Sequence, residues 1–257
     1  MGTSDTHMIP PQTPTPPAFR IENPQGKNRI LLVCEHASPH IPGEYADLSM
    51  SAETRASHAA WDIGATRLAS LLAQALDAPL VAATVSRLVI DLNRRLEAPS
   101  LIVAETDGFF VPGNRDLSDS EKQDRIARFH VPFHATIAHR MTAHQPDLLL
   151  TIHSFTPVFK GYSRAVEIGI VHDDDPRFAN ALHPLLQPGP FDVRVNEPYG
   201  PEDDATYTLH RHGVGQGCPN AMIEIRNDLL GNEAAIAHMA GYLSPHIQQA
   251  VQSLKSG

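Results

Sequence analysis

The sequence predicts an α/β protein of the three-layer α/β/α kind, in which a mixed, mostly parallel sheet lies between helices. Short apolar runs alternate along the chain with longer amphipathic segments, the pattern of strand and helix units in such domains. The chain has 257 residues, which is enough for a full core and within the range of one α/β domain. No linker divides it, so we expect a single domain over residues 21–257.

The N-terminal segment and the first strand differ sharply in composition. Residues 1–20 are rich in Pro and Thr and cannot form a core, so we expect a disordered tail there. Residues 30–34 are an apolar run that leads directly into Glu35 and His36. A buried parallel strand has this composition when it delivers polar groups to a site at its C-terminal end.

The remaining elements follow the same alternation. Further strands are expected at residues 80–84, 88–92, 148–152, 166–171, 191–195 and 221–225. Helices are expected at residues 51–76, 121–144, 175–186 and 232–251, with Ser120 capping the second and Pro132 kinking it. The stretch 166–195 is also suited to an antiparallel strand. Long polar loops are expected at residues 96–119 and 196–219, where functional groups often lie.

Composition excludes several classes of function. The net charge of -9, without a stripe of Lys and Arg, argues against a nucleic-acid-binding surface. No apolar run approaches the roughly 20 residues of a membrane span, and the N-terminus has no signal-peptide pattern. Two cysteines form no disulfide framework. We therefore expect a cytoplasmic protein without nucleic-acid or membrane partners, and no pattern indicates its oligomeric state.

Two of the fifteen histidines are candidate metal ligands. His36 and His153 each come at the end of a predicted buried strand, where the alternative role is a hydrogen bond to the backbone. A catalytic zinc usually has three protein ligands, and the third is either Glu35 or Asp62. Adjacent residues of a strand point to opposite faces, which disfavours Glu35. Asp62 lies beside Trp61 in the predicted helix 51–76, an unusual place for an acid without a partner.

Three further groups are suited to the substrate or to proton transfer. The pair Asn93-Arg94 is a candidate carboxylate clamp, because a guanidinium matches a carboxylate with two hydrogen bonds. Arg115, in a long loop, is a second candidate for substrate contact. Glu224 lies within a buried strand and is either a general base or the partner of Arg226 in an ion pair.

Cys34 ends the first apolar run. A free cysteine in that position is more often a small core residue than a nucleophile, although a Cys/His pair with a nearby histidine remains an alternative.

Several segments together resemble the N-formylglutamate amidohydrolase family, in its uncharacterised N-formylglutamate amidohydrolase-like branch. They run from about residue 30 to 245, almost the whole chain outside the tail. The matching segments are Cys34-Glu35-His36-Ala37-Ser38, His58-Ala59-Ala60-Trp61-Asp62-Ile63-Gly64, Ser86-Arg87-Leu88-Val89-Ile90-Asp91-Leu92-Asn93-Arg94, Pro112-Gly113-Asn114-Arg115, Ile152-His153-Ser154-Phe155-Thr156-Pro157, Asn196-Glu197-Pro198-Tyr199, Tyr207-Thr208-Leu209-His210-Arg211-His212-Gly213 and Ile223-Glu224-Ile225-Arg226.

The resemblance implies a fold similar to zinc carboxypeptidases and aspartoacylases, of the phosphorylase/hydrolase-like, zinc-exopeptidase type. It implies metal binding by His36 and His153, substrate-carboxylate binding by Asn93-Arg94 and a base at Glu224. The early His-x-x-Glu motif of those relatives is absent, since Pro39 stands three residues after His36. Asp62 is therefore the predicted second ligand. Other residues in matching segments that are candidates for contact with the substrate are Asn196, Tyr207 and His212.

The resulting hypothesis is a zinc-dependent amidohydrolase with one metal ion. His36, Asp62 and His153 hold the zinc, and Glu224 accepts the proton of the attacking water. The family's reaction, N-formyl-L-glutamate to glutamate and formate in histidine degradation, is the expected example. Three alternatives stay open: a zinc carboxypeptidase on short peptides, a metal-free amidohydrolase using Cys34, and a non-catalytic module that binds an acidic metabolite.

Overall fold

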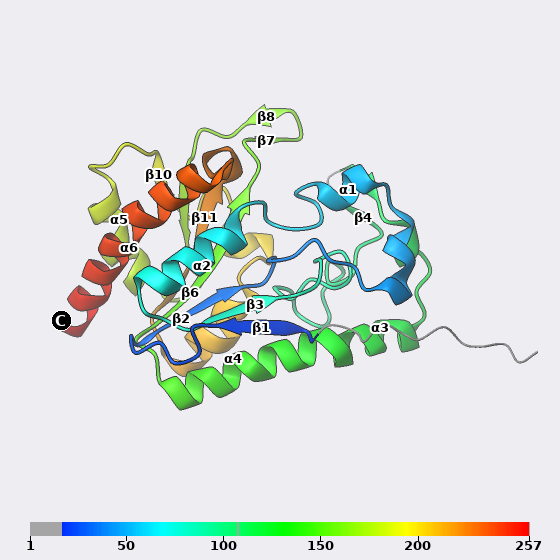
Figure 1. The fold of residues 1–257 in the computed structure, drawn as a ribbon, viewed down its shortest axis with the longest axis horizontal. Helices are drawn as coiled ribbons and strands as arrows, with labels where there is room; N and C mark the ends of the chain where they lie inside the picture. Colours follow the sequence, from blue (N-terminus) through cyan, green and yellow to red (C-terminus); the bar gives the residue numbers. More distant parts are fainter. Residues whose placement is uncertain (1–16, 107, 257) are drawn as a thin grey trace, which may run out of the picture.

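A seven-stranded mixed sheet forms the middle of the molecule (Figure 1). The computed structural model describes residues 17–106 and 108–256. The sheet has the order β1-β3-β2-β6-β11-β9-β10, with antiparallel pairing of β1 to β3 and of β9 to β11 and parallel pairing of the other neighbours. The predicted mixed, mostly parallel sheet is confirmed. Its strands are β1 (Phe19–Glu22), β2 (Ile30–Cys34), β3 (Leu80–Ala83), β6 (Leu148–Phe155), β9 (Ile168–Val171), β10 (Val193–Val195) and β11 (Asn220–Arg226).

The central strands are buried on both faces. Every residue of β2, β3 and β6 is buried, which explains why these segments have nearly continuous apolar sequences rather than an alternating pattern. A polar residue in such a strand is almost completely shielded from solvent. His153 in β6 and Glu224 in β11 therefore need partners within the protein or a ligand.

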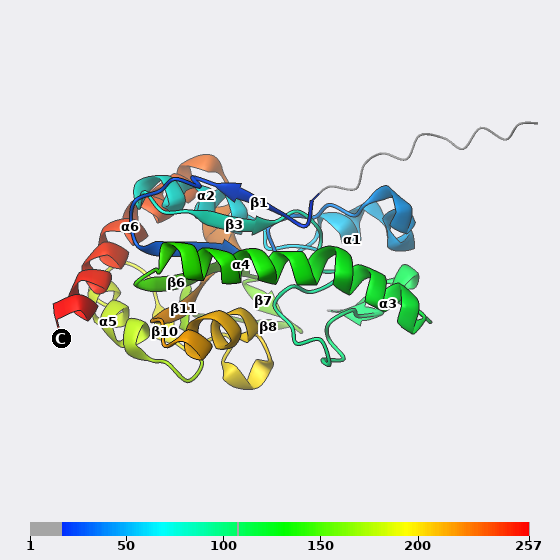
Figure 2. The ribbon, with the colours of Figure 1, turned by 90° about the horizontal axis from the view of Figure 1, so that it is seen from below.

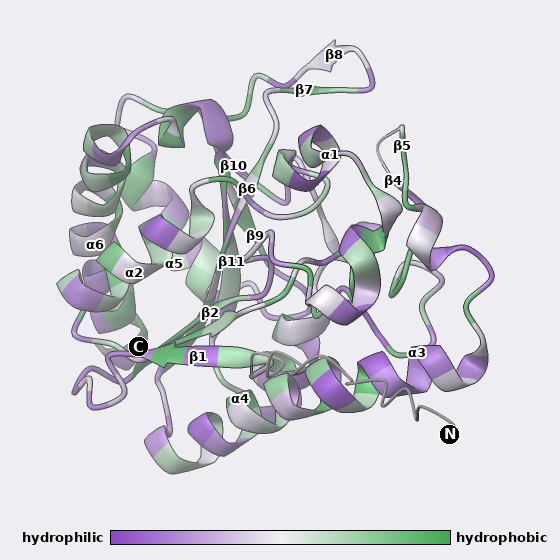
Figure 3. Cartoon of the chain, turned by 45° about the vertical axis from the view of Figure 1, so that its right-hand side comes forward, coloured by the Kyte–Doolittle hydropathy of each residue, from purple (hydrophilic) through white to green (hydrophobic). Residues whose placement is uncertain are grey.

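Helices cover both faces of the sheet. α2 packs on β2 and β6, and α6 packs against both α2 and α5, while α4 contacts β2 and β3 from the opposite face (Figures 1 and 2). Colouring by hydropathy shows green strands inside and mixed purple and green helices around them (Figure 3). The predicted three layers are therefore present. The helices are α1 (Ala52–Ala56), α2 (Ala65–Ala75), α3 (Asp119–Arg125), α4 (Val131–His144), α5 (Arg177–Leu186) and α6 (Glu233–Ser256).

The predicted helix over residues 51–76 is wrong in its middle. α1 ends at Ala56, and α2 begins only after Gly64, whose φ of +84° places it in the left-handed region. A side chain at Gly64 would also clash with Leu230. Asp62 consequently lies in the connection between two helices, where its side chain can turn inward.

The predicted strand at residues 88–92 is also wrong. Leu88, Val89, Ile90 and Leu92 are buried as their apolar character suggests, but the segment is an irregular loop outside the sheet. The apolar run reflects burial, and burial alone does not distinguish a strand from a packed loop. The main-chain groups of this loop need hydrogen-bond partners other than a neighbouring strand.

One long helical stretch follows the loop. α3 continues through the π-helical turn η3 (Ile126–His130) into α4, whose first turn contains Pro132. The N-cap of α3 is Ser118 rather than the predicted Ser120, because Ser118 and Glu121 form a reciprocal capping box.

Short elements lie within and beside the predicted long loops. Two small hairpins pair β4 (Glu105–Thr106) with β5 (Phe109–Phe110), and β7 (Val158–Phe159) with β8 (Tyr162–Ser163). The π-helical turn η5 (Leu209–Gly213) lies in the second loop.

The boundary of the predicted tail needs one adjustment. Phe19 and Arg20 belong to the edge strand β1 and pair with β3. Residues 1–16 of the predicted tail lie outside the described residues. Among the helices that the structure describes, none is long and apolar enough to cross a membrane.

Candidate active site

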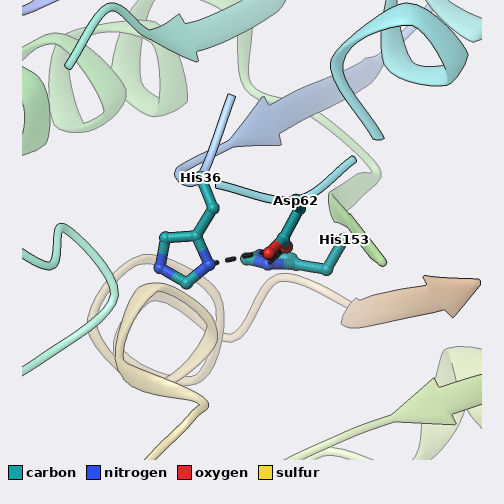
Figure 4. Close-up of side chains that lie close together, drawn as sticks. All are labelled: His36, Asp62 and His153. Atoms are coloured by element: carbon teal, nitrogen blue, oxygen red, sulfur yellow. Dashed lines mark hydrogen bonds and ion pairs between the residues drawn. The ribbon is translucent and has the colours of Figure 1, made fainter. Parts of the chain in front are cut away.

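Three buried side chains meet at the C-terminal ends of β2 and β6: His36, Asp62 and His153 (Figure 4). His36 follows β2 by two residues, and His153 lies within β6. The main-chain N–H of Asp62 donates to the carbonyl oxygen of His36 at 3.0 Å, which holds the connection between α1 and α2 against the end of β2. Parallel strands end at one edge of the sheet, so residues far apart in sequence converge there.

The spacing of these side chains suits one divalent ion. His153 Nδ1 lies 2.9 Å from Asp62 Oδ2, and His36 Nδ1 lies 3.5 Å from the same oxygen. The three ligand atoms lie within 4.8 Å of one another. Two imidazoles and one carboxylate are an ordinary ligand set for catalytic zinc, and atoms bound to one tetrahedral zinc lie about 3.4 Å apart. The donor set and its spacing therefore fit a zinc-type ion.

A carboxylate stands behind each imidazole. His36 Nε2 lies 2.8 Å from Asp91 Oδ1, and His153 Nε2 lies 3.0 Å from Glu35 Oε2. His153 Nδ1 also lies within hydrogen-bond distance of Asp62 Oδ2. With a metal ion bound, each Nε2–H would donate to its carboxylate and leave the Nδ1 lone pair of a neutral ring for the ion. Metal-bound histidines usually have such a partner on the other ring nitrogen, which fixes the tautomer and the ring orientation. Glu35 contacts the ring of His153 and does not belong to the cluster of three, and the choice of Asp62 rather than Glu35 as the third ligand stays a prediction.

The electrostatics of the cluster favour positive charge at its centre. Burial opposes ionisation, yet Arg87 and then His36 hold the pKa of Asp62 well below its usual range. Burial also works against the imidazolium form, but Glu35 and Asp62 raise the pKa of His153 and Asp91 raises that of His36. The same negative field would stabilise a divalent cation.

Glu224 is the carboxylate next to this cluster. It pairs in register with His153 of the neighbouring strand, and it lines the cavity in front of the three side chains. Burial raises the pKa of Glu224 to about 7. Among the described residues, its Oε2 is buried without a hydrogen-bond partner. A carboxyl group with this pKa exchanges protons readily near neutral pH, as a general base requires.

Gly169 leaves room for Glu224. This glycine of β9 pairs with Glu224 across the sheet, and a side chain on it would meet the carbonyl oxygen of Glu197 and the Cβ of Glu224. Its identity follows from a close approach of chains rather than from a turn.

Arg87 brings a positive charge to the same place. Its Nη2 forms an ion pair with Asp62 Oδ1 at 3.0 Å, and its Nη1 lies 3.3 Å from His36 Nδ1. Hydrogen bonds to the carbonyl oxygens of His58 and Ala59 fix the guanidinium. Arg87 and Asp62 both line the cavity, so this ion pair borders it.

Arg94 and Asn93 line the cavity, but their side chains differ in how many protein hydrogen bonds they form. The Asn93 side-chain amide donates to Ala205 O, and its oxygen accepts from the N–H of Thr208 at 3.0 Å. Arg94 Nη1 donates to the carbonyl oxygen of Asn93 at 3.0 Å. Its Nε is buried and has no partner among the described residues, so Arg94 has donor capacity for an anion.

The cavity in front of these groups has a volume of about 400 Å³ and an open mouth. Its polar wall consists of the cluster, Glu224, Arg87 and Arg94, and its outer wall includes Phe159 and Lys160 of the β7–β8 hairpin. This volume suits a small molecule.

Four predicted substrate contacts are not among the residues that line this cavity: Arg115, Asn196, Tyr207 and His212. Arg115 is exposed, because the adjacent turn (Pro112–Asn114) instead buries Asn114 in hydrogen bonds to Leu88 O and Val103 O.

The other three of these side chains have structural partners. Asn196 accepts a hydrogen bond from the N–H of His172. Tyr207 and His212 pack in a separate group of aromatic and imidazole rings behind the cavity.

Cys34 is completely buried, and burial raises the pKa of its thiol well above the ordinary value. Its sulfur faces Thr66 Oγ1 at 3.9 Å. A thiol that stays protonated is a poor nucleophile, so the geometry agrees with the packing role expected for Cys34.

Comparison with known proteins identifies the family. The model of the N-formylglutamate amidohydrolase family matches residues 28–230. The chain belongs to this family. The match confirms the resemblance drawn from the sequence motifs and supports an amidohydrolase. A search of curated proteins found no match to the chain.

Two crystal structures from this comparison are similar over almost the whole chain. A gene product from Agrobacterium tumefaciens is 43% identical, with a TM-score of 0.91 over 93% of this chain and 97% of that one. An N-formylglutamate amidohydrolase from Ralstonia eutropha JMP134 is 19% identical, with a TM-score of 0.67 over 93% of this chain and 99% of that one. At that identity, the second similarity concerns the fold.

Asp91, which contacts His36, was assigned no role from the sequence, and Glu35, which contacts His153, was considered only as the alternative third metal ligand. A signal was present for Asp91, which stands two residues before Asn93 in a segment that the family resemblance included. For Glu35 the signal was the alternation along the strand. Its side chain points away from that of His36 and contacts His153.

Proposed function

We propose that this protein is a metal-dependent hydrolase of the amide bond in small N-acyl amino acids, with N-formyl-L-glutamate as the first substrate to test. The observation that carries the proposal is the cluster itself. Two histidine Nδ1 atoms and one carboxylate oxygen lie within 4.8 Å of one another, and each histidine is fixed by a second carboxylate. Glu224 and Arg94 line the same cavity.

The proposed metal ligands are His36, Asp62 and His153. A zinc ion bound there would supply a Lewis acid that polarises an amide carbonyl and lowers the pKa of water. Asp91 and Glu35 would hold the two rings in the required tautomer.

The remaining roles fall to Arg94 and Glu224. Arg94 binds the carboxylate of the substrate, because its buried Nε faces no protein acceptor among the described residues. This contact fixes the acyl amide in front of the cluster, which lowers the entropic part of the barrier. Glu224 accepts a proton from the attacking water at a carboxylate oxygen and passes it to the leaving nitrogen.

Metal analysis and a substrate panel test the proposal. The purified protein is expected to contain about one divalent ion per chain and to lose activity when the ion is removed with a chelator. The panel compares N-formyl-L-glutamate, other N-acyl amino acids and short peptides. Glu224→Gln is expected to abolish most of the activity and retain the metal, whereas Glu53→Gln, at an exposed position on α1, serves as the matched control.

Three results would contradict the proposal. Full activity in the absence of a bound divalent ion would exclude the metal mechanism. Cleavage of peptides without cleavage of N-acyl amino acids would instead indicate a carboxypeptidase. Saturable binding of N-formyl-L-glutamate without turnover of any compound in the panel would indicate a binding module.

A further inference from the structure

A second group of histidines lies outside the cavity wall and has no role in the proposed chemistry. His130 belongs to η3, His134 to α4 and His212 to η5, and all three are buried. The rings of His134 and His212 are stacked at 5.2 Å with an interplanar angle of 14°, and His130 lies 4.4 Å from His134 between ring centroids. Tyr207 covers the same rings. We refer to His130, His134 and His212 as the inner histidines.

The hydrogen bonds of the inner histidines assign their tautomers. His134 Nε2 lies 2.9 Å from Leu92 O, and His130 Nε2 lies 3.0 Å from Arg94 O, so both nitrogens donate a proton to a carbonyl oxygen. In a neutral His134 ring, Nδ1 is then an acceptor. His212 Nε2, at 3.0 Å from it, must donate. One ordered chain of donors thus runs from His212 through His134 to the main chain.

This chain supports the segment that carries Arg94. Residues 91–95 form no strand, so neighbouring strands do not satisfy their carbonyl groups. His134 binds the carbonyl before Asn93, and His130 binds the carbonyl of Arg94 itself. Arg125 of the same helical stretch donates to Val89 O at 2.9 Å, farther back along the loop. The helix therefore holds the loop at three main-chain points.

The π-helical turn is what brings these donors to one face. Residues advance by about 100° each in an α-helix, so residues five apart lie about 140° from each other. Arg125 and His130 are five apart, with η3 between them. Because a π turn bonds each residue to the fifth along, it aligns the two side chains toward the loop.

We propose that His134, supported by His212 and accompanied by His130, positions the main chain around Asn93 so that Arg94 presents its guanidinium to the substrate carboxylate. The inference rests on the proposed carboxylate-binding role of Arg94. The inner histidines are positioning residues, because they contact the loop and not the cavity.

Burial keeps this support uncharged. It lowers the pKa of His134 to about 2 and that of His212 to about 4, and it lowers the pKa of His130 as well. The groups that bear on them are the neighbouring histidines, Arg211 beside His212, and the distant carboxylates of Asp91, Glu97 and Glu35. Neutral rings at 4.4 to 5.2 Å do not repel one another, so the chain of donors persists at neutral pH.

The test compares a substrate that has the α-carboxylate with one in which an α-carboxamide replaces it. His134→Phe keeps a ring and removes both nitrogens, whereas His134→Gln retains an N–H donor in reach of Leu92 O. For N-formyl-L-glutamate, His134→Phe is expected to raise KM about tenfold with kcat changed less than about twofold, and His134→Gln is expected to restore most of the loss. For the α-carboxamide of the same compound, KM is expected to be the same in wild type and variant.

Further variants separate this inference from the proposed function. His139→Phe changes an exposed histidine of the same helix and is expected to match wild type. In an Arg94→Met background, His134→Phe is expected to add little, because the group that it positions is already absent. If Arg94→Met alone leaves KM unchanged, the assigned role of Arg94 fails and this inference fails with it.

If Arg94→Met raises KM but His134→Phe alters both substrates equally, Arg94 keeps its role and the inner histidines are structural only. Should His134→Phe not fold, His212→Phe removes the donor to His134 Nδ1 and tests the same chain. An unchanged KM in that variant would overturn the inference.

Discussion

The two histidine groups use the same side chain under opposite electrostatic conditions. His36 and His153 each have a carboxylate on Nε2 and share Asp62, and these acids raise their pKa despite burial. The inner histidines have carbonyl oxygens and one another as partners, and burial lowers their pKa. Both groups are buried, so the partners, and not burial alone, decide whether the pKa of a histidine is raised or lowered.

The sharpest test of this contrast makes one substitution in each group. His153→Phe is expected to remove the metal and to lower kcat/KM at least about 1,000-fold, since loss of the ion removes several kcal/mol of transition-state stabilisation. His134→Phe is expected to keep the metal. Circular dichroism checks that both variants are folded like wild type. Metal content per chain and kcat/KM are then measured for each variant. Equal metal loss in both variants would contradict the proposal that only the group of His36 and His153 binds the metal.

The next largest effect concerns Glu224 and the pH dependence of kcat/KM. Because its folded pKa of about 7 lies above the ordinary value, the group is protonated and inactive as a base below that pH. We expect kcat/KM to fall as pH falls through the region of pH 7 and below, and Glu224→Gln to be about 100-fold slower. A pH–rate profile checks both points. If kcat/KM of the Glu224→Gln variant still falls at low pH as in wild type, a group other than Glu224 is responsible for that fall.

The carboxylates that contact His36 and His153 are expected to have a smaller effect on activity, because they act through metal affinity. Asp91→Asn keeps an oxygen acceptor for His36 but loses its charge, so metal affinity should weaken about 10- to 100-fold. Glu35→Gln should act in the same way through His153. Competition with a chelator of known affinity measures the change. Asp116→Asn is the matched control, because Asp116 is exposed and its left-handed φ of 57° suits Asn as well. An affinity equal to wild type in Asp91→Asn would show that this charge does not tune the site.

The smallest expected effect concerns stability. A histidine whose folded pKa is lowered binds a proton more readily when unfolded, so its contribution to stability is present at neutral pH and is lost as pH falls below about 6.5. For His134, with a folded pKa of about 2, the loss continues below pH 4 and has a limiting slope of about 1.4 kcal/mol per pH unit. His134→Gln has no such proton to bind. Its difference in unfolding free energy from wild type should shrink between pH 6.5 and 4, as measured by urea unfolding. A constant difference would mean that His134 is not neutral in the folded protein.

Much of the site around the cavity was predictable from the sequence, because buried strands are recognisable by their apolar runs. His36, His153 and Glu224 all belong to strands or strand ends that the pattern located correctly. The order of the strands was not predictable, and it is this order that places β11 beside β6 and so Glu224 beside His153. Asp62 was selected as an acid in a helix, whereas the structure breaks the helix around it.

The inner histidines show why the rest of the site was missed. Tyr207 and His212 belong to matching segments of the family, and the resemblance alone suggested substrate contact. Their orientation depends on η5, and single-sequence patterns contain no reliable signal for a π turn. The buried loop at residues 88–92 was mistaken for a strand for a related reason. Its main-chain carbonyl oxygens accept hydrogen bonds from Asn114, Arg125 and His134, which are distant in sequence.

The three-point support of that loop has a consequence for how the family can diverge. Arg125, His130 and His134 donate to main-chain oxygens, which every amino acid provides, so replacement of Val89 or Leu92 by another apolar residue leaves the contacts intact. Conversion of η3 to ordinary α-helix at the same length would place Arg125 and His130 about 140° apart on the helix and turn Arg125 away from the loop. In relatives that keep a spacing of five residues between these two donors, the π turn should therefore be kept as well, while the apolar side chains of the loop are free to vary.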